Sequence, residues 1–205
     1  MRERAKEHFP TVLLTLVSIV QALALELWWS HLIQVDVWSG WTGLITALQI
    51  FATLLGIVLV WVIYSSNVMR FRWVPGTMDS VFPFLIGLIE FMLVETLGPE
   101  RLGFWFVLMA VIFSFMNWIG HLTMRSARRD PDNRAYFEGV ASARLRDFRG
   151  QIFGVIVLGI VGVYFILSAQ RGVLALVVLL ALIALLSYQF QQTAIFWKRS
   201  LVDDP

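Results

Sequence analysis

Cysteine is absent from this 205-residue sequence, and lysine and histidine are scarce. Without cysteine the chain has no disulfide, no thiolate nucleophile and no cysteine-ligated metal or iron–sulfur site. The histidines, His8, His31 and His121, are far apart and none belongs to a His-Glu-x-x-His sequence, so we expect neither a histidine metal site nor a paired-histidine haem site. Lysine occurs only at Lys6 and Lys198, outside the apolar runs, which excludes an intramembrane Schiff base.

Sequence motifs of common enzyme and channel classes are also missing. The chain has no Gly-x-Ser-x-Gly nucleophile elbow and no glycine-rich phosphate-binding loop. It also lacks the Thr-Val-Gly-Tyr-Gly sequence of a potassium-selective filter. The sequence therefore predicts a protein that is not an enzyme and that holds neither a cofactor nor a metal ion.

Long apolar runs dominate the chain. Hydrophobic residues make up 59% of it, the mean hydropathy is +0.76, and the charged residues gather between the runs. A helix needs about 20 apolar residues to cross about 30 Å of hydrocarbon. Six runs meet this requirement: roughly 10–33, 42–66, 80–97, 102–124, 150–170 and 173–196. The predicted fold is an all-α integral membrane protein with six transmembrane helices in one compact bundle, a single domain over residues 1–205.

The basic residues predict the orientation of these helices. Of the 16 lysines and arginines, 14 lie before the first run or after the second, fourth and sixth, and only Arg101 and Arg171 lie on the other side. By the positive-inside rule both termini are cytoplasmic, in a multi-pass protein of the plasma (inner) membrane. The first run is too long for a secretory signal and lacks a small-residue cleavage site, so we expect it to remain as the first helix. Topology accounts for the basic composition, and no nucleic-acid partner is expected.

The third run contains an acidic residue, Glu90, well inside its apolar sequence. An ionised carboxylate in hydrocarbon costs roughly 2.5–3.5 kcal/mol on insertion scales, so such a group normally faces a partner, the bundle interior or water. The alternative is that it keeps its proton, because desolvation disfavours the charged form. Glu90 is therefore the first candidate functional residue.

Polar and small residues recur every three or four positions on three other runs, which places each set on one helical face. The sets are Thr11, Thr15, Ser18, Ala22 and Glu26; Thr42, Thr46, Gln49, Thr53 and Gly56; and Ala110, Ser114, Asn117 and His121. We expect these faces to pack together with Glu90 and to line a narrow polar interior. The alternative for the hydroxyls is that they bond to carbonyls of their own helix while small residues permit close packing. His121 has a second interpretation as an ordinary boundary residue at the headgroups.

The segment 125–149 is the main polar stretch. Asp130-Pro131 is typical of a helix start, and the residues that follow predict a short amphipathic helix on the cytoplasmic surface, between spans four and five. Its arginines are expected to contact anionic lipid headgroups, or alternatively a cytoplasmic protein partner. They are Arg125, Arg128, Arg129, Arg144, Arg146 and Arg149. In the fifth span, Gly150-x-x-x-Gly154 predicts close helix approach.

Two functional hypotheses follow. The first is a pathway for ions, protons or a small solute, with Glu90 central. Its other predicted lining residues are Glu26, Asn117, His121, Gln49, Ser18, Thr46 and Thr53. A pore wide enough for hydrated ions would form between subunits, so a homo-oligomer is expected. The alternative is a non-transporting sensor or scaffold that recruits a cytoplasmic partner or detects anionic lipid through segment 125–149.

Overall fold

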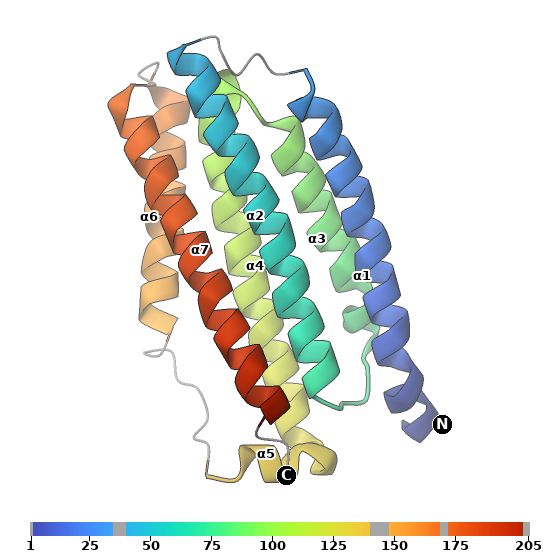
Figure 1. Cartoon of the computed structure of the whole chain (residues 1–205). Helices are drawn as coiled ribbons and strands as arrows, with labels where there is room; N and C mark the ends of the chain where they lie inside the picture. Colours follow the sequence, from blue (N-terminus) through green and yellow to red (C-terminus); the bar gives the residue numbers. More distant parts are fainter. Residues whose placement is uncertain (1, 35–39, 140–147, 169–171, 203–205) are drawn as a thin grey trace.

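The computed structural model describes residues 2–34, 40–139, 148–168 and 172–202, which are almost entirely helical (Figure 1). The α-helices are α1 (Arg2–Leu32), α2 (Trp41–Arg70), α3 (Thr77–Glu95), α4 (Leu102–Arg129), α5 (Arg134–Phe137), α6 (Arg149–Leu167) and α7 (Val173–Val202). Two short 3-10 helices, Pro99–Arg101 and Pro131–Asn133, precede α4 and α5. The described residues contain no strand.

Six of these helices, all except α5, are long and apolar enough to cross a bilayer. This confirms the predicted number of apolar helices and supports a multi-pass membrane protein. Several helices continue beyond the predicted apolar limits, because charged residues at headgroup depth can still form helical turns: α2 ends at Arg70 and α4 at Arg129. The type of membrane and the side on which the termini lie stay predictions.

The basic segment contains less helix than the sequence predicts within the part that is described. Asp130 does cap the turn that begins with Pro131, its side chain accepting a hydrogen bond from the Asp132 amide. However, α5 spans only four residues, and Gly139 then adopts a positive φ of 77°. Residues 140–147, with Arg144 and Arg146, lie outside the described residues. The predicted amphipathic helix is therefore described only as this one turn.

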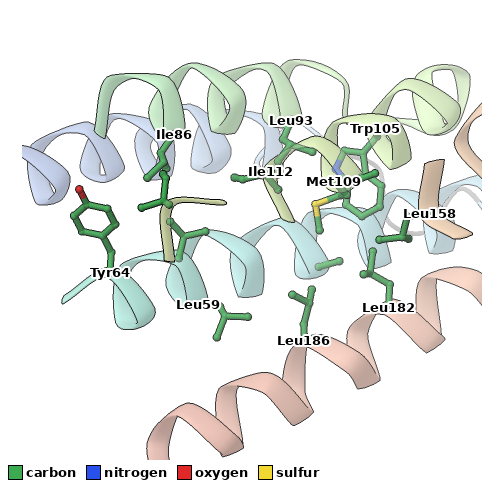
Figure 2. Close-up of a cluster of buried hydrophobic side chains, with 14 of the residues drawn as sticks. Leu59, Tyr64, Ile86, Leu93, Trp105, Met109, Ile112, Leu158, Leu182 and Leu186 are labelled. Carbon is green, nitrogen blue, oxygen red and sulfur yellow. The ribbon is translucent and has the colours of Figure 1, made fainter. Parts of the chain in front are cut away.

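The helices pack in a defined order. α1 contacts α2 and α3, α3 contacts α4, α4 contacts α6, and α2 contacts α7. In Figure 1, α6 and α7 accordingly lie on the opposite side of the bundle from α1. The aromatic residues Trp105 and Phe106 of α4 are fully buried at the centre, and the Phe106 ring stacks on Phe165 of α6. Figure 2 shows part of this core, with Met109, Ile112 and Leu158 close together.

The tightest crossing joins α4 to α6 at two glycines. A Cβ atom added to Gly103 would lie 2.6 Å from the Ile166 nitrogen and 2.7 Å from the Gly162 oxygen. By contrast, a Cβ on Gly150 or Gly154 would meet nothing within 4 Å. Gly150-x-x-x-Gly154 therefore makes no close helix contact among the described residues of this chain.

An ionic cluster joins the start of α1 to the end of α4. The Lys6 ammonium donates to the Asp130 carboxylate at 2.9 Å and to Asp132 at 3.1 Å. Burial alone would raise the pKa of the Asp130 carboxyl, but the hydrogen bonds from Lys6 and the Asp132 amide outweigh it and lower that pKa. Asn133 fixes the loop after α2 to the same place, because its side chain accepts from the Arg72 amide and donates to the Arg72 carbonyl. We call this the arginine-rich end of the bundle, because six arginines lie there: Arg70, Arg125, Arg128, Arg129, Arg134 and Arg149.

The glycine crossing generates a stability prediction. Substitution Gly103→Ala should lower the free energy of unfolding by about 1–3 kcal/mol, because the methyl group meets backbone atoms of α6 that cannot move aside. Thermal unfolding of the detergent-purified protein measures this. The matched control is Gly159→Ala on α6, where a Cβ meets nothing within 4 Å. Equal stability of the two variants would contradict the close crossing.

A buried carboxyl beside an apolar cavity

Glu90 lies in α3 and is completely buried. The Gln21 side chain of α1, itself only 4% exposed, donates a hydrogen bond from Nε2 to Glu90 Oε1 at 2.9 Å. The other carboxyl oxygen, Oε2, has no hydrogen-bond partner among the described residues. One oxygen is therefore held and the other is available.

A close contact between α1 and α3 places Gln21 opposite Glu90. Gly87, nearly one turn before Glu90, packs so closely on Val20 that even a methyl side chain there would collide with it. Because Val20 precedes Gln21, this approach brings the glutamine amide within reach of the carboxyl. Gly87 is thus the residue that permits the hydrogen bond.

Glu90 lines a cavity of about 810 Å³ between α2, α4, α6 and α7. Binding sites for drug-sized molecules occupy about 300–1,000 Å³. Most lining side chains are apolar: Ile57, Leu59, Val60, Ile63, Leu93, Met109, Ile112, Phe113, Met116, Met124, Phe148, Val155, Leu158 and Leu185. Among the described residues that line the cavity, Glu90 is the only acidic or basic one.

The cavity differs between its two ends. Toward the arginine-rich end the lining includes amides and a hydroxyl, and several of these residues are exposed. They are Asn117, Gln151, Gln189, Gln192 and Thr193. Near Glu90 the lining residues Thr53, Ile57, Met109 and Leu158 are all buried. The cavity is therefore open toward the arginine-rich end and closed at the other.

Hydrogen-bonding groups continue from the closed end toward the α3–α4 turn. The Trp105 indole donates to Thr53 Oγ1 at 3.0 Å, and the Thr53 hydroxyl donates to the Gln49 carbonyl at 2.8 Å. The Gln49 side chain accepts from the Gly98 amide at 3.2 Å, while its Nε2 has no partner among the described residues. The structure thus buries Gln49 and Thr53 inside the bundle, as their helical face predicts. Thr46 is also buried, and its hydroxyl donates to the carbonyl of Thr42 in its own helix.

The polar face predicted for the first span points the wrong way. Ser18 and Glu26 are exposed on the outer surface of α1, and Ser18 accepts a hydrogen bond from the exposed Trp61 indole. The opposite face, with Val17 and Gln21, packs into the bundle. The interior positions predicted for Ser18 and Glu26 are therefore wrong, because the larger apolar side chains of α1 fill the contact with α3.

The remaining predicted residues separate into two groups. Asn117 is half-buried and lines the cavity. His121, one turn further along α4, is exposed and absent from the lining, and its ring stands edge-on to Phe148 at 6.4 Å. Arg125, Arg129 and Arg149 are exposed near the arginine-rich end. Arg128 lies over the Phe137 ring at 4.5 Å.

Sequence reasoning missed the partner of Glu90 and the amides at the open end. Gln21 falls between the small and hydroxyl residues of the first run, and an isolated glutamine within an apolar run was the available signal. Gln151, Gln189 and Gln192 lie near the ends of the fifth and sixth runs, where glutamines also suit a headgroup position. A glutamine deep in an apolar run indicates a buried polar contact, as an acidic residue does, because its amide also needs a hydrogen-bond partner.

No known family model, curated protein or solved structure matches this chain. Among the described residues, no group of three or more His, Asp or Glu side chains is placed to hold a metal ion. The cavity and its buried carboxyl are the features of the described residues that bear on function.

The hydrogen bond between Gln21 and Glu90 generates a second prediction. Gln21→Leu should lower the free energy of unfolding by about 1 kcal/mol, because both carboxyl oxygens then lack a partner in a buried site. Chemical or thermal unfolding in detergent measures the loss, and Thr15→Ala is the control, because the exposed Thr15 hydroxyl donates only to the Thr11 carbonyl of its own helix. If Gln21→Leu were as stable as Thr15→Ala, the hydrogen bond would not be contributing.

Proposed function

We propose that the protein forms a proton pathway across the membrane, in which Glu90 takes up and releases the proton. The observation that carries this proposal is the position of Glu90. It is completely buried and, among the described residues, it is the only acidic or basic one that lines the cavity, with one carboxyl oxygen that has no partner. Proton relays inside membrane proteins are commonly built on such isolated intramembrane carboxyls.

Polar side chains on both sides of Glu90 support a route for the proton. From the open end, Gln192 and Asn117 lead along the cavity toward Glu90. Beyond it, Thr53 and Gln49 lead to the backbone of Gly98 at the opposite turn. These groups offer hydrogen bonds to water along the route, which a proton requires and a purely apolar cavity does not supply.

The cavity walls favour a proton over a hydrated ion. The predominantly aliphatic and aromatic lining offers no ring of carbonyls or charges that could replace a hydration shell. The cavity also lies within a single chain, so this pathway needs no pore on a symmetry axis. Because Trp105 is fully buried at the closed end, we infer that conduction requires it to move.

The proposal predicts that Glu90→Gln abolishes proton flux. Proteoliposomes containing a pH-sensitive dye report proton entry driven by an imposed membrane potential, and we expect a fall of at least about 10-fold because the amide cannot exchange a proton. Glu26→Gln is the matched control, since Glu26 is exposed on α1. Equal flux through wild-type protein and the Glu90 variant, both shown to be folded, would refute the role of Glu90.

A second function, detection of anionic lipid, is favoured by a hollow at the arginine-rich end. Its volume is about 460 Å³, and it is lined by Arg128, Arg129, Asp130, Pro131, Arg134, Phe137 and Glu138. Lys6 already pairs with Asp130, so this carboxylate is balanced by a cation other than the arginines. The hollow therefore keeps a positive charge suited to a lipid phosphate at headgroup depth.

We expect the double substitution Arg129→Gln and Arg134→Gln to weaken retention of phosphatidylglycerol by about 30-fold, since each arginine near a membrane surface contributes about 1 kcal/mol. Native mass spectrometry of protein released from detergent counts the bound lipids. Arg149→Gln, exposed but outside the hollow, is the control. An equal loss in the control would point to general surface charge and contradict a specific site.

A further inference from the structure

We propose that the cavity binds a lipophilic monoamine in its protonated form, with the ammonium group paired to Glu90. This rests on the proposed proton pathway in one respect, because the amine and the pathway proton compete for the same carboxyl. The protein would then exchange a proton for a lipophilic cation.

The charge of the cavity sets the charge of its ligand. Glu90 is the only acidic or basic side chain among the described lining residues of α2, α3, α4, α6 and α7, and its neighbour on α1, Gln21, is neutral. A buried charge needs a compensating charge. One carboxylate is matched by a proton or by one positive charge, whereas an anion or a divalent cation leaves net charge in an apolar space. The chain supplies no such cation at Glu90 within its described residues, since no ion pair reaches it.

The geometry of the carboxyl favours a ligand that donates a hydrogen bond. Gln21 occupies Oε1, and Oε2 is buried without a protein partner. An ammonium group can pair with Oε2 through an N–H donor and through its charge, and such charge-assisted hydrogen bonds are about twice as strong as neutral ones. A neutral alcohol supplies the donor without the charge.

The apolar walls of the cavity favour a ligand that is hydrophobic apart from its ammonium group. Val60, Met109 and Ile112 present an apolar surface near Glu90, and the volume of about 810 Å³ suits an organic molecule. Met109, Met116 and Met124 line one side, and methionine adapts its shape to different apolar partners. A bare metal cation would find no set of oxygen ligands here, while an apolar body gains from burial.

The open end offers weaker, neutral contacts. Gln151, Gln189 and Gln192 present amides that can hydrogen-bond polar substituents far from the ammonium group. The described lining residues at this end are neutral, while the nearby Arg125 and Arg149 are exposed and outside the described lining. The described cavity wall therefore places no positive charge beside the path to Glu90.

The binding step balances as a proton exchange. The protonated Glu90 carboxyl loses its proton to solvent, the ammonium group of the amine keeps its own protons, and a carboxylate–ammonium pair forms. One proton is released for each amine bound. Among the described lining residues, the only other titratable side chain is Tyr188 of α7, and Tyr188→Phe controls for it.

The experiment uses the full chain in nanodiscs of zwitterionic lipid, with empty nanodiscs subtracted. The probes are 2-naphthylmethylamine and its neutral counterpart 2-naphthalenemethanol, and binding is measured by equilibrium dialysis. We expect the amine to bind at least about 10-fold more tightly than the alcohol, and Glu90→Gln to remove this preference while Glu26→Gln keeps it. Equal binding of the two probes to the wild-type protein would overturn the proposal.

A second variant tests the location without changing the carboxyl. Gly154 lines the cavity and a Cβ there meets nothing within 4 Å, so Gly154→Leu adds a side chain at the cavity wall while leaving the α4–α6 crossing intact. We expect amine binding to fall at least about 10-fold, because the leucine occupies the binding volume. Gly159→Leu, on the same helix but outside the lining, should bind normally. Unchanged binding to Gly154→Leu would place the amine elsewhere and refute the cavity site.

The outcomes separate this inference from the proton pathway. Glu90-dependent amine binding without Glu90-dependent proton flux would reject the pathway and keep the ligand. Glu90-dependent flux without selective amine binding would reject the ligand class and keep the pathway.

Discussion

The structure depends on burying one carboxyl group in an apolar bundle. Glu90 is fully enclosed, and Gln21 satisfies one of its oxygens. This hydrogen bond requires α1 and α3 to approach closely, and the approach is possible because Gly87 has no side chain opposite Val20. The orientation of α1 follows, since turning Gln21 inward turns Ser18 and Glu26 outward. The hydrogen bond to the buried acid and the apolar side chains on the same face of α1, such as Val17, therefore favour the same orientation of this helix.

The cavity arises from how the last two long helices attach to the others. α6 packs on α4 at the crossing of Gly103 and Gly162, whereas α7 packs on α2. Because α6 and α7 pack against different helices, space is left between them. Near Glu90 large side chains such as Trp105 fill that space, while toward the arginine-rich end small residues and amides such as Gly154 and Gln192 leave it open.

The sequence predicts the helices well and their faces less well. Run length alone finds six spans, and the isolated charge alone identifies Glu90. The recurrence of polar residues every three or four positions correctly predicts that Gln49 and Thr53 are buried, but it predicts the wrong buried face for α1. A hydroxyl can donate its hydrogen bond to a carbonyl of its own helix, as Thr15 does to Thr11, so it can lie on a buried or an exposed face. Which face packs depends on the partner helix, and no local pattern in the first run reveals the glycine at position 87. The same limit applies to close helix crossings, where the sequence offered several glycines and the structure uses Gly103 and Gly162.

The basic residues of the chain explain why Glu90 has no cationic partner of its own. Positive charges stay at the helix ends, where they meet headgroups and water. At one end Lys6 is held by Asp130 and Asp132, and at the other Arg101 donates to the carbonyl of Glu95. A permanent ion pair at Glu90 would fill the free oxygen and fix the carboxyl in its charged state. Because the hydrogen bond from Gln21 is neutral, the carboxyl can instead change its protonation state or accept a cation from outside while the helix contact stays in place. The separation of the basic ends from the buried acid therefore leaves Glu90 Oε2 without a cationic partner among the described residues, as the proposed exchange requires.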